Sequence, residues 1–506
     1  MRDASRIVVA TSRSRGGCAH HRNRRTRTAV TRTRTIRPAR TVAALRREVN
    51  SIRSSRVCPS SQRVSIIRAD VAGKDRRAPD STVIAAGRWL LLAGLLFMVT
   101  GDGPATTIRL SKWPTPLPFL AYPWLYLSLL LLGIAVFVAG GGVKSWKPSH
   151  LRFIVMPIVA LLSAFLLSAV TSQVRSMSAT ALLTVLGIVA VCWILALIFE
   201  DERLREAIWP TLAIAVILLA VRVILWRVDE GLNVVAFQVL NNFWQGKLQL
   251  AWVFNLMAPL LLVRAMGEPS PRLAALYWFT WIVAGVATYL LFSRMGSIVF
   301  GMTTLGVWTF NPRQWRKVLV ILIVALAIGA ALVARSSKMS RFVATTILKP
   351  DRDPGVEQRF GVWREALLLF RSRPITGTGL GTYDEVTYRL EGNTAEPVFR
   401  RNGWHAHNVY LHLLAETGTL GLLAWCFFWY AIIARLLDAW KQADARYGLY
   451  AAGALWAVLA FLVLSISEVL IGARVHASLR MNLTIGLVVV LGLHIAAEID
   501  RRRSLH

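Results

Sequence analysis

Cysteine is scarce in this sequence, and so are the short motifs that hold metals or phosphates. The four cysteines in 506 residues are Cys18, Cys58, Cys192 and Cys426. Their spacing matches neither a disulfide framework nor a zinc motif. The chain also has no HExxH or CxxC motif and no P-loop. These absences exclude a disulfide-stapled domain and leave no recognisable metal or nucleotide-phosphate motif.

Acidic residues are also few, with 27 Asp and Glu against 59 Lys and Arg, for a net charge of +32. Half of this charge comes from residues 1–80, which hold 21 Lys and Arg against 5 Asp and Glu. This tail has no apolar periodicity and lacks the apolar core of a secretory signal. It fits a disordered basic arm for anionic lipid or nucleic acid, an Arg-rich transit peptide, or upstream DNA translated from a misplaced start. These three interpretations remain open.

Long uncharged apolar runs are plentiful. The chain is 55% hydrophobic, with a mean hydropathy of +0.50, and residues 117–140 and 181–199 carry no charge. Runs of ~18–20 such residues can cross the hydrocarbon core as helices. We therefore expect an all-α, polytopic integral membrane protein with about twelve transmembrane helices. The expected spans are 82–100, 119–140, 152–171, 179–199, 207–226, 248–266, 272–293, 295–310, 316–334, 419–437, 449–470 and 481–497.

The distribution of basic residues between the short loops predicts an orientation. With the N-terminus inside, the inner loops and the C-terminal tail hold 16 Lys and Arg, and the outer short loops hold 8. This bias favours cytoplasmic N- and C-termini. The chain then divides into a basic tail (1–80), spans one to nine (81–334), an outer catalytic loop (335–418) with short interfacial helices, and spans ten to twelve (419–500). Loops of this length are usually functional or disordered.

The exit of the long loop, "GWHAHNVYLHLLAETGTLG" at residues 403–421, carries a cluster of histidines. Asn408 is a strong helix N-cap, and Gly418 is a typical residue after a helix end. Residues 409–417 therefore predict a helix of about 13 Å, too short to cross a membrane. His407 lies just before its N-terminus and can act as a general base. The alternative is an interfacial histidine that only reaches the headgroups.

A metal site is a weaker interpretation of the same histidines. His405, His407 and either His412 or Glu416 could together bind zinc. However, alternate residues point in opposite directions on a strand and lie far apart on a helix. The acidic "DRD" at 351–353 resembles the metal-binding pair of nucleotide-sugar transferases, but a solvated turn before Pro354 explains it better. We predict no metal site.

Two arginines lie near the outer ends of predicted spans. Arg294, in "LLFSRMGS", sits at a sharp break between two spans, and Arg222 lies near the end of span five. An ionisable residue at membrane depth is a functional hypothesis by default, and arginine binds phosphate bidentately. Either side chain could instead extend to the headgroups, an explanation that fits Arg222 better than Arg294.

The middle of the loop predicts an amphipathic interfacial helix that ends before Pro374, because its apolar residues have helical spacing. Arg359 and Arg364 lie on this helix. The "GTGLG" that follows, at 377–381, predicts a tight turn whose amides, including that of Gly379, could bind a phosphate. Together with the histidine cluster, these features indicate an outward-facing site for a lipid-linked phosphate.

Several of these motifs resemble the O-antigen ligase and polymerase superfamily. His407-Asn408, nine residues and then Gly418-x-x-Gly421 is similar to its signature. "RFGVWREALLLFRSRPITGTGLGTY" resembles its R…W..A…P..G.G.G block, and "SR" at 293–294 and "FN" at 254–255 match weaker marks. The resemblance covers roughly residues 82–497; the tail 1–80 has no counterpart in it.

The resemblance implies a metal-independent, inverting glycosyltransferase without cofactors, at the periplasmic face of the bacterial inner membrane. The donor would be a glycan on undecaprenyl diphosphate and the acceptor lipid A–core, another lipid-linked repeat or a protein hydroxyl; no nucleic-acid partner is implied. His407 would act on the acceptor hydroxyl, and Arg294 and Arg359 would stabilise the departing diphosphate. The substrate-binding residues would be Asn408, Arg222, Arg364, His405 and Gly379. An alternative of another class is a lipid-linked glycan flippase.

Overall fold

The computed structural model describes residues 82–100, 123–143, 151–229, 247–291, 293–309, 354–390, 405–467 and 475–504, with isolated positions 323 and 327. The chain divides into two units, and these residues all belong to the larger one, Asp80–His506. Every regular element among them is a helix. The basic tail and the predicted span 316–334 lie outside the described residues, apart from those isolated positions.

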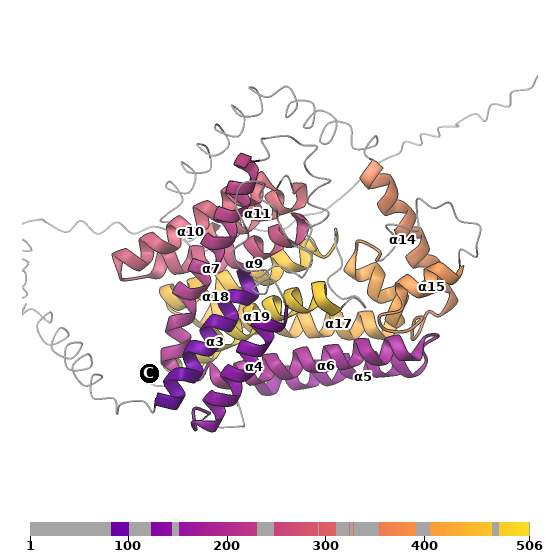
Figure 1. Ribbon diagram of the computed structural model, residues 1–506, viewed down its shortest axis with the longest axis horizontal. Helices are drawn as coiled ribbons and strands as arrows, with labels where there is room; N and C mark the ends of the chain where they lie inside the picture. Colours follow the sequence, from indigo (N-terminus) through magenta and orange to yellow (C-terminus); the bar gives the residue numbers. More distant parts are fainter. Residues whose placement is uncertain are drawn as a thin grey trace, which may run out of the picture. The chain divides into compact units, whose positions relative to one another are not determined.

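The described helices reproduce eleven of the twelve predicted spans and the two helical segments of the long loop (Figure 1). In chain order they are α3 Thr82–Thr100, α4 Pro123–Ala139, α5 Arg152–Val170, α6 Arg175–Ile198, α7 Glu202–Asp229, α9 Lys247–Gly267, α10 Pro271–Leu290, α11 Arg294–Thr309, α14 Pro354–Ser372, α15 Tyr383–Leu390, α17 Val409–Gln442, α18 Ala445–Leu464 and α19 Val475–Arg503. Within this part of the chain, nine helices are long and apolar enough to cross a membrane. The all-α polytopic class is confirmed, whereas the count of twelve stays a prediction.

Glycines allow several of these helices to pack closely. Gly87 of α3 lies against Phe137 of α4, and Gly94 lies against Leu130, so closely that an added Cβ atom would come within 3 Å of them. Small residues at helix contacts are the usual means of close packing in membranes, because the hydrophobic effect does not drive helices together in apolar lipid. The most covered span is α9, which is 89% buried, and the least covered is α6, at 22%. The bundle is therefore centred on α9, and α6 lies at its periphery.

Different helix ends and different polar contacts lie at the two ends of the bundle. At one end, which we call the terminus end, α3 begins and α19 ends. There Asp201, just after α6, pairs with Arg88 of α3, and His494 of α19 contacts the carbonyl of Ala196. Because the described unit starts and finishes at the same end, its arrangement fits termini on one side of the membrane. Which side this is stays a prediction.

At the opposite end, which we call the loop end, α5 and α18 finish and α17 begins. The Val409 amide donates to the Ser465 carbonyl at 2.8 Å, and the Ser168 hydroxyl donates to the Glu416 carbonyl at 2.8 Å. The short helices α14 and α15 lie beside the start of α17 (Figure 1). The loop end therefore gathers the segments that the sequence singled out.

Candidate functional site

The predicted short helix before span ten is confirmed. Asn408 is extended, and its Oδ1 accepts the Leu411 amide at 3.1 Å, which satisfies one of the unpaired donors of a helix start. The helical backbone breaks at Gly418, with φ +64° and ψ −164°. Residues 409–417 thus form a separate short helix, and the long transmembrane part of α17 follows from residue 419.

His407 occupies a strained backbone position. Its φ of +47° makes it the one non-glycine residue with positive φ in the described part of the chain. Residues with a Cβ atom adopt this left-handed region at a cost of roughly 1–2 kcal/mol. Such strain persists where surrounding structure holds it, and it is concentrated at functional sites. Here it is held between the buried Ala406 and the Asn408 cap.

The unusual backbone of His407 also brings two imidazoles together. The rings of His405 and His407 lie 4.1 Å apart between centroids, and both side chains are half-buried. The expectation that these alternate residues point apart was wrong, because it assumed regular strand or helix geometry. Within the described residues, no group of three His, Cys, Asp or Glu side chains is placed to hold a metal ion.

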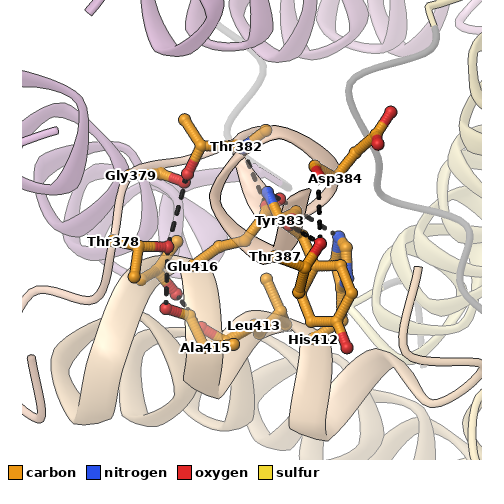
Figure 2. Close-up of polar contacts among 12 residues, drawn as sticks. Thr378, Gly379, Thr382, Tyr383, Asp384, Thr387, His412, Leu413, Ala415 and Glu416 are labelled. Carbon is orange, nitrogen blue, oxygen red and sulfur yellow. Dashed lines mark hydrogen bonds and ion pairs between the residues drawn. The ribbon is translucent and has the colours of Figure 1, made fainter. Parts of the chain in front are cut away.

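A buried carboxylate fastens the glycine turn to the short helix. Glu416 is 1% exposed, and its Oε2 and Oε1 accept the amides of Gly381 at 2.8 Å and Tyr383 at 3.0 Å. The same carboxylate lies 3.3 Å from Nε2 of His412. Figure 2 shows this arrangement, with the turn folded over the end of the short helix. Two segments more than 30 residues apart are therefore joined by one side chain.

The glycine turn, residues 377–381, is also held to the short helix by its own backbone amides. We call this connection between the turn and the short helix the Glu416 joint. Thr378 donates to the Ala415 carbonyl at 3.0 Å and Gly379 to the Glu416 carbonyl at 2.9 Å, while Gly381 donates to the carboxylate. A Cβ atom on Gly379 would come within 2.1 Å of the Ser172 hydroxyl. The predicted tight turn is present, but these three amides are not available to a phosphate. The amide role that we expected for Gly379 is corrected to a packing role.

Tyr383 extends the joint to the amphipathic helix. Its ring packs against that of His412, with 5.0 Å between centroids, and its hydroxyl donates to the Val362 carbonyl of α14 at 2.8 Å. Sequence reasoning named Glu416 and His412 as possible metal ligands, and it gave His412 otherwise a supporting or structural role without a partner. Their spacing of four residues on a short helix was the signal that they could pair.

The amphipathic helix of the loop is confirmed as α14, which ends at Ser372 before Pro374. Val362, Ala366 and Leu369 are buried, as predicted from their spacing, and Phe370 is half-buried. The apolar side chains of Phe360, Leu367 and Leu368 are exposed on the other side of the helix. Arg359 is half-buried and Arg364 is exposed. Arg373, just after the helix, donates to the Thr171 carbonyl at 2.7 Å and ties the loop to the end of α5.

Arg294 is the first residue of α11, and its surroundings are rigid. The Ser293 hydroxyl accepts the Gly296 amide at 3.1 Å, and the buried Asn255 donates to the Gly296 carbonyl at 3.1 Å. The "SR" and "FN" marks, 38 residues apart in the sequence, therefore meet at one point. The Arg294 side chain is exposed, although the backbone around it is held by these contacts. A side chain placed in this way can reach a ligand.

Arg222 has a neighbour that the sequence did not indicate. It lies on α7, half-buried, close enough to Arg480 of α19 for their like charges to repel. Arg480 is 1% exposed and donates to the Val99 carbonyl at the end of α3. Arg222 is thus placed with α3 and α19.

Fold and site together define a class of protein: an all-helical, polytopic membrane protein with a strained histidine directly before a short helix at one end of the bundle. A family model described as O-antigen ligase matches residues 279–426, a range that includes Arg294, α14, the glycine turn and the short helix. This match supports membership of the O-antigen ligase and polymerase superfamily, whose members are glycosyltransferase-type enzymes.

One relative has also been found by sequence comparison. An uncharacterized protein of Haemophilus influenzae is 24% identical over 162 residues, which are 30% of this chain and 41% of that protein. The match thus spans about two fifths of the relative's length.

Proposed function

We propose that this protein transfers a glycan from undecaprenyl diphosphate to an acceptor hydroxyl of lipid A–core at the periplasmic face of the bacterial inner membrane. The observation that carries the proposal is His407, held in a strained left-handed conformation directly before an Asn-capped short helix, within the segment that matches the O-antigen ligase family. In the proposed orientation, both termini are cytoplasmic and the loop end faces the periplasm.

The proposed reaction is an in-line displacement at the anomeric carbon of the donor. The acceptor oxygen forms a bond to this carbon while the carbon–oxygen bond to the diphosphate breaks, which inverts the configuration. The acceptor proton passes to His407, and the bonding electrons leave with undecaprenyl diphosphate. General-base assistance of this kind contributes about 10²–10⁴-fold to rate.

Arg294 and Arg359 are the proposed partners of the leaving group. Its diphosphate gains negative charge as the bond breaks, and prearranged cations stabilise such charge strongly where water is excluded. The Ser293 and Asn255 contacts fix the base of Arg294, which supports this role. His405, Asn408, Arg364 and Arg222 are proposed to bind the substrates around this centre, with no metal or other cofactor.

The family match is shared by ligases, polymerases and related transferases, so the acceptor must be tested directly. Purified protein in proteoliposomes would receive lipid-linked donor with lipid A–core, a second lipid-linked repeat or a protein acceptor. We expect glycosylated lipid A–core as the main product. Extended lipid-linked glycan would identify a polymerase, and glycosylated protein an O-oligosaccharyltransferase. Donor moved across the bilayer without any new bond would identify a flippase and overturn the proposal.

A further inference from the structure

Helix α14 has apolar side chains on two opposite sides, and only one of the two sides is buried. The buried side packs against α15 and the start of the short helix, in a cluster that includes Ala366, Leu369, Tyr383, Ala406 and Ala415. This is the side whose spacing predicted contact with the membrane interface. Because it packs inside the protein instead, any contact between α14 and a membrane must involve the opposite side.

The opposite side of α14 combines large apolar side chains with arginines. Phe360 is 60% exposed, Leu368 51% and Leu367 40%. At about 3.6 residues per turn, Arg364 and Arg371 project from the same side, and both are exposed. No carboxylate is exposed among the side chains of α14 that the structure describes. Phenylalanine and leucine with arginine are typical of a helix that lies in the interface of an anionic bilayer.

The exposed apolar surface continues from α14 onto the lipid-facing side of α17. Ile375, which follows α14, is 63% exposed, and its carbonyl accepts the Leu420 amide at 3.3 Å. Leu420 is the first of a row of exposed residues along the transmembrane part of α17, which goes on with Leu423, Phe427 and Tyr430. Because this row contacts the hydrocarbon of a membrane, the end of α14 lies at the level where that hydrocarbon begins.

Charge and position favour lipid over a second copy of this chain as the occupant of this surface. In a symmetric dimer the same surface faces itself, so Arg364 and Arg371 of the two copies would lie close together and repel. An anionic lipid surface is attracted to the same two arginines. The continuity with α17 also places the surface where lipid surrounds every copy.

We propose that the exposed side of α14 docks on the bilayer surface at the loop end and binds anionic phospholipid there. Its apolar side chains enter the boundary between headgroups and acyl chains, and the Arg371 guanidinium donates to lipid phosphates. Arg364 lies on the same side and retains the substrate role proposed above. The inference rests on the fold and does not depend on glycan transfer.

Docking of α14 links the bilayer surface to the candidate site. The buried side of the helix shares its cluster with Ala406, which directly precedes the strained His407. Helix α14 therefore lies between the proposed lipid surface and the segment that positions the imidazole.

Hydrogen–deuterium exchange of the full chain in nanodiscs tests the proposal. The two disc compositions are phosphatidylcholine alone and phosphatidylcholine with phosphatidylglycerol, and peptides of α9, the most buried span, are the internal reference. We expect the α14 amides to exchange at least about fivefold more slowly with phosphatidylglycerol, because one arginine near an anionic surface contributes about that factor. Equal exchange in both discs would overturn the docking.

Two variants separate the charge from the apolar contact. Arg371→Gln should remove most of the difference between the discs, whereas Arg203→Gln, which removes an exposed arginine at the terminus end, should retain it. Leu368→Gln should speed the exchange of α14 in both discs, because it removes an exposed apolar side chain and keeps a similar helix propensity. An unchanged difference in Arg371→Gln, or unchanged exchange in Leu368→Gln, would refute the proposed contact.

Two further discs identify the occupant of the surface. Discs that hold one copy of the chain, separated by mass, should show the full slowing of exchange. Slowing confined to discs with two copies would identify a contact between copies and overturn the proposal. In discs with lipid A in place of phosphatidylglycerol, slowing by lipid A alone would identify the acceptor as the occupant, which also overturns it.

Discussion

The two ends of the bundle use their acidic residues differently. At the terminus end, the Asp201 carboxylate accepts both Nε of Arg88 at 3.0 Å and Nη2 at 2.7 Å, and Arg264 lies 3.1 Å from Glu206 and 3.6 Å from Glu268. At the loop end, the buried carboxylate of Glu416 instead accepts two backbone amides and lies beside an imidazole.

Under the proposed function, the difference separates charges that stabilise the fold from charges that contact a ligand. An arginine paired in fork geometry with a carboxylate at a bundle end is already compensated. At the loop end, the carboxylate of Glu416 holds a loop through backbone amides. Under the proposed function, Arg294 and Arg359 supply the positive charge that an anionic leaving group meets.

The largest expected effect comes from removing the imidazole at the strained position. His407→Ala should lower glycan transfer by at least about 100-fold, because it removes the proposed base, with little loss of stability. Initial rates with purified protein and its thermal unfolding would measure both. His405→Ala, the neighbouring ring, should be partly tolerated. Wild-type surface polysaccharide in a strain complemented with His407→Ala would contradict the assignment.

A conservative change of charge should distinguish the two ends. Arg294→Lys should reduce transfer roughly tenfold or more, because a single ammonium cannot replace the two-pronged guanidinium on a diphosphate. Arg88→Lys at the terminus end is the matched control, and we expect it to affect unfolding temperature more than turnover. Near-normal turnover of Arg294→Lys would remove this residue from the site.

Changing the buried acid should mainly affect stability. Glu416→Gln replaces one accepting oxygen by an amide donor, so a buried partner is left unsatisfied at a cost of about 1–3 kcal/mol. Thermal unfolding in detergent would measure this loss. Transfer should recover at lower temperature, because the carboxylate holds the loop and does not react. Full stability with lost transfer would assign Glu416 to the chemistry instead.

The smallest effect is expected at the helix cap. Asn408→Ala removes the acceptor for the Leu411 amide and should cost about 1 kcal/mol, while Asn408→Ser should retain most of the cap. Unfolding free energies of the two variants would be compared. If both variants lose transfer equally while remaining stable, Asn408 contacts substrate through its amide group.

Local signals predicted the local structure. Asn408 and Gly418 bound the short helix as expected, since capping and chain reversal depend on neighbouring residues alone. The Glu416 contact with Gly381 could not be predicted, because it joins segments 35 residues apart through tertiary packing. The same holds for Arg222 and Arg480. The meeting of His405 and His407 depended on one unfavourable backbone angle, which sequence patterns do not encode.

The break at Gly418 has a consequence for bilayer thickness. Just beyond it, the amides of Thr419 and Leu420 donate to the carbonyls of Pro374 and Ile375, at 2.8 Å and 3.3 Å. The amides of Thr378 and Gly379 donate to the short helix, so residues 374–379 are bonded to both sides of the break and hold the two parts of α17 in register. The depth of His407 is set by the covalent chain and these bonds, not by the lipid around it. A thicker or thinner bilayer would shift the whole bundle and leave this depth, measured along α17, unchanged.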